Sequence, residues 1–176
     1  IGLELTESVS PAGMFSVLQE SAVVKNLNVS GTVAPAGQKS NAGGIVGENY
    51  GLIQNCTFIG TITGQTNVGG IAGINGYTGT VKNCRTNGSV SGENKTGGIV
   101  GYNQGTIIKG KNDASVNNAV LDPSVSTENL NLEITTDVTQ LNSLDVSNVS
   151  SDIGGIAGYS TGIIEDCSNT GMVGYP

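Results

Sequence analysis

The stretch GGIVGENYGLIQNCTFIGTITG, residues 43–64, decides the fold because its opening phrase returns along the chain. Gly-Gly-Ile-(Val/Ala)-Gly stands at 43–47, 69–73, 97–101 and 154–158. The starts are 26, 28 and 57 residues apart, and 57 is close to two periods. A phrase that recurs at a period in the twenties is typical of stacked repeats and not of a globule with one centre.

A second phrase follows each Gly-Gly phrase, and its residues alternate in character. Counting by twos from Cys56 gives Phe58, Gly60 and Ile62. This period of two indicates a strand with one face turned inward. With an earlier copy in which Gly13 to Ser16 replace the Gly-Gly phrase, the recognisable copies lie near 13–35, 43–64, 69–92, 97–118 and 154–175.

An apolar residue, such as Ile53 or Val81, stands three positions before the residue equivalent to Cys56. An odd step cannot keep both on one face of a flat strand, so a corner or bulge is expected between them. Copies stacked in parallel place like residues about 4.8 Å apart, and crowded positions then need small residues. Glycine accounts for 28 of 176 residues, against a usual share of about 7%. The sequence predicts one all-β domain over 1–176, a parallel β-solenoid (β-helix) of about five to six rungs.

The repeats resemble the GLUG-motif repeats of bacterial cell-surface proteins. The resemblance rests on GGIVGENYGLIQNCTFIGTITG and GGIAGINGYTGTVKNCRTNGSVSG, and it spans about residues 13–118 and 153–175. Such repeats occur in adhesins and in the non-catalytic parts of IgA-cleaving metallopeptidases. The resemblance implies a β-solenoid at the cell surface, and it carries over no catalytic residue. The copy at 97–118 departs from the pattern, with Gly110 at the Cys position and Asn118 at the last Gly position.

Composition bounds the function further. Seven Lys and Arg stand against 14 Asp and Glu, giving a net charge of −7, which argues against binding nucleic acid or anionic lipid. No apolar run is long enough to span a bilayer, so membrane insertion is not expected. The chain opens without Met or a leader, and we interpret it as a piece of a longer protein. Its many Asn, Thr, Ser and Gly resemble secreted proteins, and we expect an extracellular or cell-surface location.

The cysteines share one position of the repeat. Leu27, Cys56, Cys84 and Cys167 occupy it, with Gly110 in the remaining copy. Replacement by Leu indicates a buried apolar position, where free Cys also fits. Cys56 and Cys84 would lie on adjacent rungs, but side chains stacked in register stay near 4.8 Å at Cβ, beyond the usual 3.8 Å of a disulfide. Zinc is disfavoured because the chain has no His and no CxxC spacing.

Residues 119–152 contain no Gly and break the pattern. Leu130, Leu132 and Ile134 alternate as in a strand, and Val138, Leu141 and Leu144 are spaced as on a short helix capped by Thr136 or Asp137. One interpretation makes the segment a degenerate rung plus a capping helix, which fills the second period between 97 and 154. The other makes it a protruding, ligand-contacting insertion.

Catalytic and metal sites find little support. Glu165 and Asp166 are adjacent and point apart in a strand, Glu48 and Glu93 are isolated turn residues, and Asp113 lies near Lys109 and Lys111 as a surface ion pair. The chain lacks His, the commonest catalytic base. Calcium could use the acids around the irregular segment, but none matches a known calcium-loop spacing; they are Asp122, Glu128, Asp137, Asp145 and Asp152. We expect no enzyme activity, no cofactor and no metal.

A tyrosine stands within four residues after each Gly-Gly phrase, and we expect these tyrosines along one edge of the stack. They are Tyr50, Tyr77, Tyr102 and Tyr159. They either cover the turns that close each rung or form a contact surface for a sugar or a protein.

The sequence favours a non-enzymatic surface module, adhesin-like or a stalk, that presents a rigid face to a host protein or a glycan. A polysaccharide-active β-helix enzyme is one alternative, and it would need acids converging in one groove. A structural spacer of a larger secreted peptidase is the other. Exposed strand edges also make end-to-end self-association of this piece of chain plausible.

Overall fold

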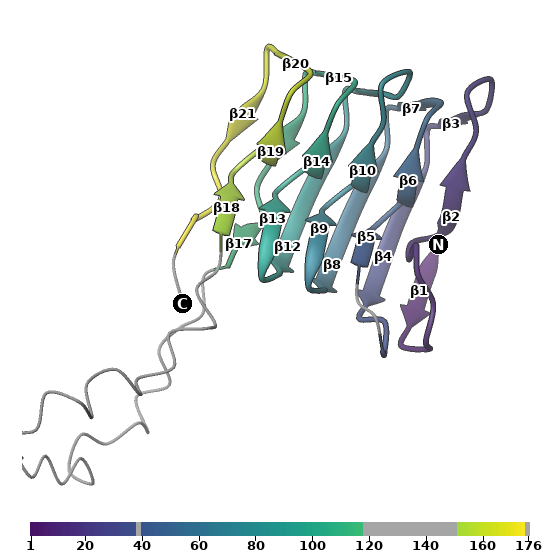
Figure 1. The fold of residues 1–176 in the computed structure, drawn as a ribbon, viewed down its shortest axis with the longest axis vertical. Coiled ribbons are helices and arrows are strands. Elements are labelled where there is room, and N and C mark those ends of the chain that lie inside the picture. Colours follow the sequence, from purple (N-terminus) through teal and green to yellow (C-terminus); the bar gives the residue numbers. More distant parts are fainter. Residues whose placement is uncertain (38–39, 118–150, 175–176) are drawn as a thin grey trace, which may run out of the picture.

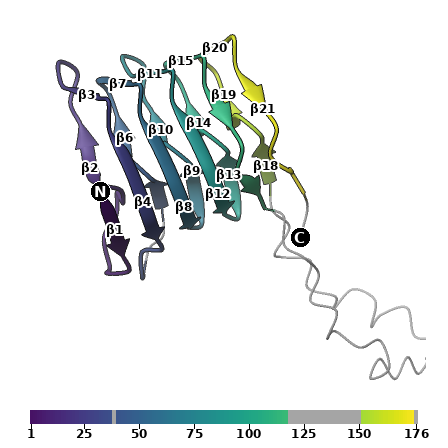
Figure 2. The same cartoon turned by 180° about the vertical axis from the view of Figure 1, so that it is seen from behind.

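The computed structural model describes residues 1–37, 40–117 and 151–174. These residues form a parallel β-solenoid of about four turns, in which four short strands make one turn (Figure 1). The turns lie side by side from the N-terminal strands to β21, and the view from behind shows the same order (Figure 2). The described ranges contain no helix.

Four sheets run along the stack, and we name them A to D. Sheet A is seven-stranded and consists of β1 (Gly2–Leu5), β4 (Asn28–Val33), β8 (Thr57–Thr63), β12 (Arg85–Ser91), β16 (Lys111–Asn112), β17 (Ser115–Val116) and β21 (Ser168–Asn169). Sheet B consists of β5 (Ser40–Gly43), β9 (Thr66–Gly69), β13 (Asn94–Gly97) and β18 (Ser151–Gly154).

Sheets C and D have five strands each. Sheet C consists of β2 (Phe15–Leu18), β6 (Val46–Asn49), β10 (Ala72–Asn75), β14 (Val100–Asn103) and β19 (Ala157–Ser160). Sheet D consists of β3 (Val23–Lys25), β7 (Leu52–Gln54), β11 (Thr80–Lys82), β15 (Thr106–Ile108) and β20 (Ile163–Glu165). Sheets B and C form the near face in Figure 1, and sheet A forms the near face in Figure 2.

Equivalent residues of successive copies pair in register, as the periodicity predicts. Thr57 pairs with Arg85 in sheet A, so the residues that precede them, Cys56 and Cys84, lie on neighbouring turns. The corner expected between Ile53 and Cys56 is present at Asn55, which has a φ of 53° between β7 and β8. The prediction of an all-β parallel solenoid is confirmed, whereas five to six rungs are not confirmed, because the described residues make about four turns.

The irregular segment does not supply a rung. Strand β13 pairs directly with β18, through Asn94 with Ser151 and Gly97 with Gly154. Sheets C and D continue across the segment in the same way, with β14 next to β19 and β15 next to β20. Since no strand lies between these neighbours, the interpretation of 119–152 as a degenerate rung is wrong. The helix predicted at 136–144 lies outside the described residues.

The position of the insertion follows from the register. Val116 pairs with Val90, and Ser151 pairs with Asn94. Residues 118–150 therefore stand where the preceding turn has only Gly92 and Glu93, at the corner between sheets A and B. Residues 151 and 152, which the sequence placed in the segment, belong to β18.

The Gly-Gly phrase is explained by close approaches of its backbone to the backbone of neighbouring turns and to a core side chain. A Cβ on Gly43 would lie 2.7 Å from Cα of Ala72 in the next turn, and one on Gly47 would lie 2.8 Å from N of Ala12. A Cβ on Gly44 would lie 2.3 Å from the ring of Phe58 across the interior. These positions exclude any side chain, whereas the Ile between them fills the core. The recurring phrase thus encodes how tightly sheets B and C pack.

A second run of glycines lies in sheet A. Gly31, Gly60 and Gly88 pair with one another, and their φ values are 143°, 155° and 115°. A Cβ on Gly60 or Gly88 would lie within 2.0 Å of the carbonyl oxygen of the equivalent glycine one turn back. Ala114 takes this position in the next turn, because Ser89 pairs with Ser115. An L-residue with a side chain rarely adopts such a φ. The strand is interrupted there and splits into β16 and β17.

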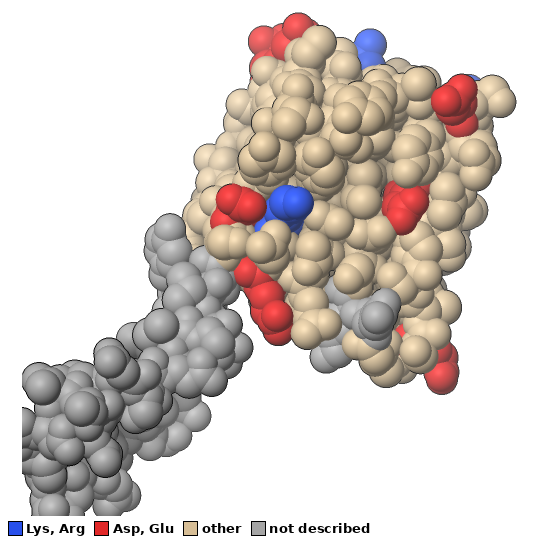
Figure 3. All heavy atoms as spheres, viewed as in Figure 1, with Lys and Arg blue, Asp and Glu red and all other residues tan. Residues whose placement is uncertain are grey.

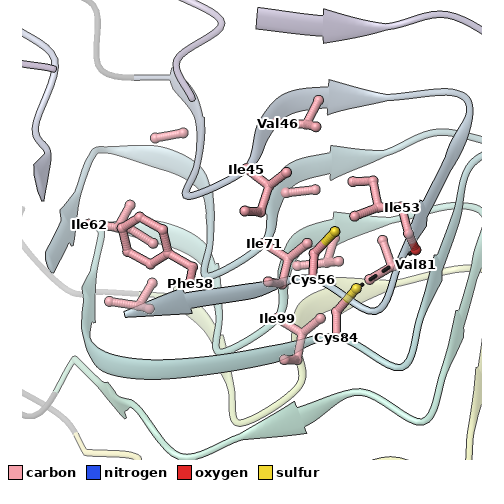
Figure 4. Packing of buried hydrophobic residues seen from close by; sticks show 14 of the residues in the cluster. Ile45, Val46, Ile53, Cys56, Phe58, Ile62, Ile71, Val81, Cys84 and Ile99 are labelled. Atoms are coloured by element: carbon pink, nitrogen blue, oxygen red, sulfur yellow. Dashed lines mark hydrogen bonds between the residues drawn. The ribbon is translucent and has the colours of Figure 1, made fainter. Parts of the chain in front are cut away.

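The core consists of rows of like side chains. Ile45, Ile71 and Ile99 are fully buried and lie above one another, with Cys56 and Cys84 beside them (Figure 4). Complete burial of one such side chain contributes about 1.5–3 kcal/mol. Each copy is covered by the next, so this burial exists only in the stack.

The interior also contains a row of amides. Nδ2 of Asn49 donates to Oδ1 of Asn75 at 2.7 Å, Asn75 donates to Asn103 at 2.8 Å, and Asn103 donates to Oγ of Ser160 at 3.0 Å. The three asparagines are completely buried. A buried amide is tolerated only when its donors and acceptors are paired, and the stack provides a partner above and below.

Candidate functional site

The outward row of sheet C holds the side chains best placed to meet a ligand. Val17, Glu48, Ile74, Tyr102 and Tyr159 pair in register along it, one from each strand. Seen from this side, the surface of sheets B and C carries few charged side chains (Figure 3). Apart from Glu48, the row therefore offers apolar and aromatic groups on a rigid, weakly charged surface.

The four tyrosines do not form a single row. Tyr102 in β14 and Tyr159 in β19 are paired neighbours, with ring centroids 5.5 Å apart and planes tilted by 52°. Tyr50 lies after the end of β6, and Tyr77 lies in the connection from β10 to β11, where it is 78% exposed. The expectation of one tyrosine edge is thus corrected: two lie in a strand row and two lie in connections.

Lys95 completes a cluster with the paired rings. It belongs to β13 and has a φ of 51°, and its Nζ lies 4.8 Å from the Tyr102 centroid and 5.5 Å from the Tyr159 centroid. A cation over a ring at such a distance is attracted by the π-electrons. The ion pairs found among the described residues all involve Asp113, so Lys95 takes part in none of them. Lys95 was missed at the sequence level because only the register of sheet B brings it beside sheet C.

A second, polar cluster lies at the other end of the same face. Nδ2 of Asn67 donates to Oδ1 of Asn41 at 2.7 Å, and Nδ2 of Asn41 donates to Oε1 of Glu48 at 2.6 Å. The Tyr50 hydroxyl donates to Oε2 of Glu48 at 3.3 Å. Burial and the nearby Glu48 carboxylate raise the pKa of Tyr50. Glu48, expected in a turn, lies in strand β6 and is held by these bonds.

The cysteine position faces the interior. Cys56 and Cys84 are free and 1% exposed, Cys167 is partly exposed in the last turn, and Leu27 packs against the core from the first. Each thiol donates to the carbonyl two residues earlier, as Cys84 does to Lys82 at 3.3 Å. The neighbouring Cys56 and burial raise the pKa of the Cys84 thiol. This side chain therefore stays protonated and serves as a core group.

Unlike Glu48, the acids Asp113, Glu165 and Asp166 lie apart from this face. Asp113 accepts from Arg85 at 2.5 Å, lies 3.5 Å from Lys111 and accepts from the Thr170 hydroxyl on sheet A. The Thr170 and Arg85 hydrogen bonds lower the pKa of Asp113. Glu165 is exposed at the end of β20, and Asp166 is exposed just after it.

Within the described ranges, no group of three or more acids and cysteines is arranged to hold a metal ion. Of the calcium candidates, Asp152 lies in β18, and the others are outside the described residues. The same ranges contain no helix with the length and apolar character needed to cross a membrane.

Comparison with known proteins gives one result. The model of the family described as "The GLUG motif" matches residues 40–63 and 145–173. The first match coincides with strands β5 to β8, which is one complete turn, and the second covers β18 to β21. No curated protein and no solved structure matches the chain. One motif thus corresponds to one four-stranded turn, and the resemblance predicted from the sequence is confirmed: the chain carries GLUG-motif repeats.

Proposed function

We propose that the chain is a non-enzymatic surface repeat module, adhesin-like or a stalk, that presents sheets B and C to a host protein or a glycan at the cell surface. The GLUG repeats and the β-solenoid fit a surface repeat module. The single observation that carries the proposal is the cluster of Lys95, Tyr102 and Tyr159 on adjacent turns.

The chemistry of the cluster suits a sugar or a peptide. Tyr159 is 43% exposed, so part of its ring is open to an apolar sugar face or a side chain. The Lys95 ammonium, poised over the rings, can donate to hydroxyl or carboxylate oxygens of the same ligand. Because the three residues come from paired strands, little conformational entropy is lost when a ligand binds.

The test is binding of the chain to a glycan panel and to immobilised extracellular host proteins. Tyr159→Ala and Lys95→Ala should each weaken binding to any ligand found by about tenfold or more. Tyr77→Ala is the matched control, because Tyr77 is even more exposed but lies outside the cluster. A ligand whose affinity is unchanged by Tyr159→Ala and Lys95→Ala would contradict this assignment of the face.

The non-enzymatic character is tested on the same panel. We expect no new reducing ends and no change in glycan length after prolonged incubation. Turnover that is lost on substitution of Glu48 or Asp113 would favour the polysaccharide-active alternative. Absence of any ligand would favour the spacer alternative.

A further inference from the structure

Basic side chains gather where sheet D passes into sheet A, along the upper edge of the near face in Figure 2. We call this region the D–A corner, and it consists of residues 25–28, 54–57, 82–85, 108–111 and 165–168. Five of the chain's seven Lys and Arg lie there, against two of its 14 Asp and Glu. The five are Lys25, Lys82, Arg85, Lys109 and Lys111, and all are exposed. The net charge of −7 is therefore unevenly distributed, and this corner is basic.

Two of the five cations are neutralised by an acid of the chain. Asp113 forms ion pairs with Arg85 and Lys111 on the outer face of sheet A. The other three take part in none of the ion pairs found among the described residues; they are Lys25, Lys82 and Lys109. These three ammonium groups are the ones available to an anionic ligand.

The three ammonium groups follow the axis of the stack. Lys82 pairs in register with Ile108, so Lys109 lies one residue further along on the next turn. Lys25 lies in the same row of sheet D as Lys82, two turns away, which is roughly 10 Å at the spacing of parallel strands. A linear polymer lying along the axis would contact all three, whereas a single small anion would not.

The backbone of Lys109 supports a role for its charge. Its φ is 53°, and the equivalent residues of the other copies, Asn26, Asn55, Asn83 and Asp166, have φ values between 50° and 56°. Asn and Asp adopt this left-handed conformation more readily than Lys does. The Lys109 side chain is exposed, so burial in the core does not account for its presence. Departures from local preference of this kind are expected at functional positions.

The neighbouring groups suit a sugar polymer better than a nucleic acid or a protein. Nδ2 of Asn83 donates to Oδ1 of Asn55 at 2.8 Å, and Asn55 donates to Asn26 at 3.1 Å, so exposed amides run beside the cations. Amides form hydrogen bonds with hydroxyl groups. None of the residues of the D–A corner is aromatic, whereas base stacking and most protein contacts rely on aromatic side chains.

The basic region lies in the interior of the stack. Four of its five cations belong to the copies 69–92 and 97–118, and each of these copies has a described turn on both sides. The two acids of the corner, Glu165 and Asp166, are in the last turn. Residues 118–150 follow β17 and therefore leave sheet A at its other corner, next to sheet B.

We propose that the D–A corner binds an acidic polysaccharide, a linear sugar polymer with carboxylate or sulfate groups, which lies along the stack over Lys25, Lys82 and Lys109. The ammonium groups pair with the anionic groups, and the amides of Asn55 and Asn83 bind hydroxyl groups between them. This surface is separate from the cluster of Lys95, Tyr102 and Tyr159 on sheets B and C, so either site can exist without the other.

The test measures binding of the chain 1–176 to immobilised dextran sulfate and polygalacturonate, with uncharged dextran as the reference. The chain should bind at least one of the two acidic polymers and not dextran, and added NaCl should weaken the binding. Lys82→Gln combined with Lys109→Asn should weaken it by about tenfold or more. The affinity of this double variant should also fall less steeply with NaCl, because fewer counterions are released.

Lys109→Asn and Lys95→Asn form a matched pair of single variants. Both positions have a positive φ, 53° and 51°, at which other copies carry Asn, and both changes remove one positive charge. Lys109→Asn should weaken binding of the acidic polymer, and Lys95→Asn should leave it unchanged. Since Asn favours this backbone conformation, neither variant should unfold, and circular dichroism checks this.

Three results would overturn the proposal. The first is binding to neither acidic polymer, and the second is an equal loss of affinity in Lys95→Asn and Lys109→Asn, which would place the polymer elsewhere. The third is binding as tight or tighter to a single-stranded DNA oligonucleotide, to polyglutamate or to vesicles containing anionic phospholipid, which would assign the corner to another class of partner. None of these results bears on the ligand face of sheets B and C, which is tested by Tyr159→Ala.

Discussion

Nδ2 of Asn75 donates a 2.8 Å hydrogen bond to Oδ1 of Asn103 in the following turn, and both side chains are completely buried. Asn75 also accepts from Asn49 and donates to the carbonyl of Gly79 at 3.2 Å. The amide thus links three turns and holds the connection that follows β10. A buried polar row of this kind fixes the register, because a shift by one residue would leave every amide unpaired.

Asn75→Ala should lower the free energy of unfolding by about 1–3 kcal/mol, because it leaves buried groups of Asn49 and Asn103 without partners. Urea unfolding followed by circular dichroism measures the change. Asn87→Ala, at an exposed position of β12, is the control and should have little effect. Equal stability of the two variants would mean that the row contributes nothing measurable.

Gly88→Ala should destabilise the chain by about 1–3 kcal/mol or more, because the φ of 115° is strained for Ala and the new Cβ would lie 2.0 Å from the Gly60 carbonyl oxygen. Gly2→Ala is the control, since a Cβ there meets nothing within 4 Å. Thermal unfolding of both variants checks this. A Gly88→Ala protein as stable as the unmodified chain would show that the sheet A glycines are not required.

The thiols should react with a water-soluble reagent in a fixed order. Cys167 is partly exposed and reacts in the folded chain, whereas Cys56 and Cys84 are 1% exposed and react only on unfolding. Burial raises the pKa of Cys167, so its rate should keep rising with pH beyond the usual thiol range. Mass spectrometry of the labelled sites measures the order, and early labelling of Cys84 would contradict the packing of the core.

Acid should weaken the contacts of Asp113. Hydrogen bonds from Thr170 and Arg85 lower the pKa of Asp113 in the folded chain. The contribution of Asp113 to the free energy of unfolding is therefore fully present above the unfolded carboxyl pKa of about 3.9, and it is lost as the pH falls through the lower folded pKa. The difference in melting temperature between the unmodified chain and Asp113→Asn should therefore shrink as the pH is lowered through this window. A difference that stays constant with pH would exclude the carboxylate as its source.

Replacing residues 118–150 by Gly-Glu should leave the solenoid folded, because Gly92-Glu93 makes the same corner in the preceding turn. The side chain of Asn117, which accepts from the Gly92 amide at 2.8 Å, already closes the end of β17. Far-UV circular dichroism and the melting temperature provide the measurement. Loss of β-structure would show that the insertion contributes to folding, and unchanged ligand binding would place recognition outside it.

The recurring Gly-Gly phrase and the alternation from Cys56 to Ile62 were sufficient to predict parallel, in-register strands, because each records a contact that repeats in every copy. The tyrosines illustrate what a period cannot reveal. Tyr102 directly follows its phrase and lies in β14, whereas Tyr77 stands four residues after its phrase and lies in the connection from β10 to β11. The buried amides were missed although Asn49, Asn75 and Asn103 recur two residues after the phrase, since a recurring polar residue was assumed to lie in a solvated turn.

Sequence alone determined the kind of fold, the positions that must be glycine and the interior position of the cysteines, because these depend on neighbours one period away. Tertiary structure decided two further matters: that residues 118–150 interrupt a corner and add no rung, and that Lys95 meets Tyr102 and Tyr159. Those features depend on which strands pair and on how sheets B and C lie next to each other. A single copy of the repeat encodes neither the pairing nor this arrangement of the sheets.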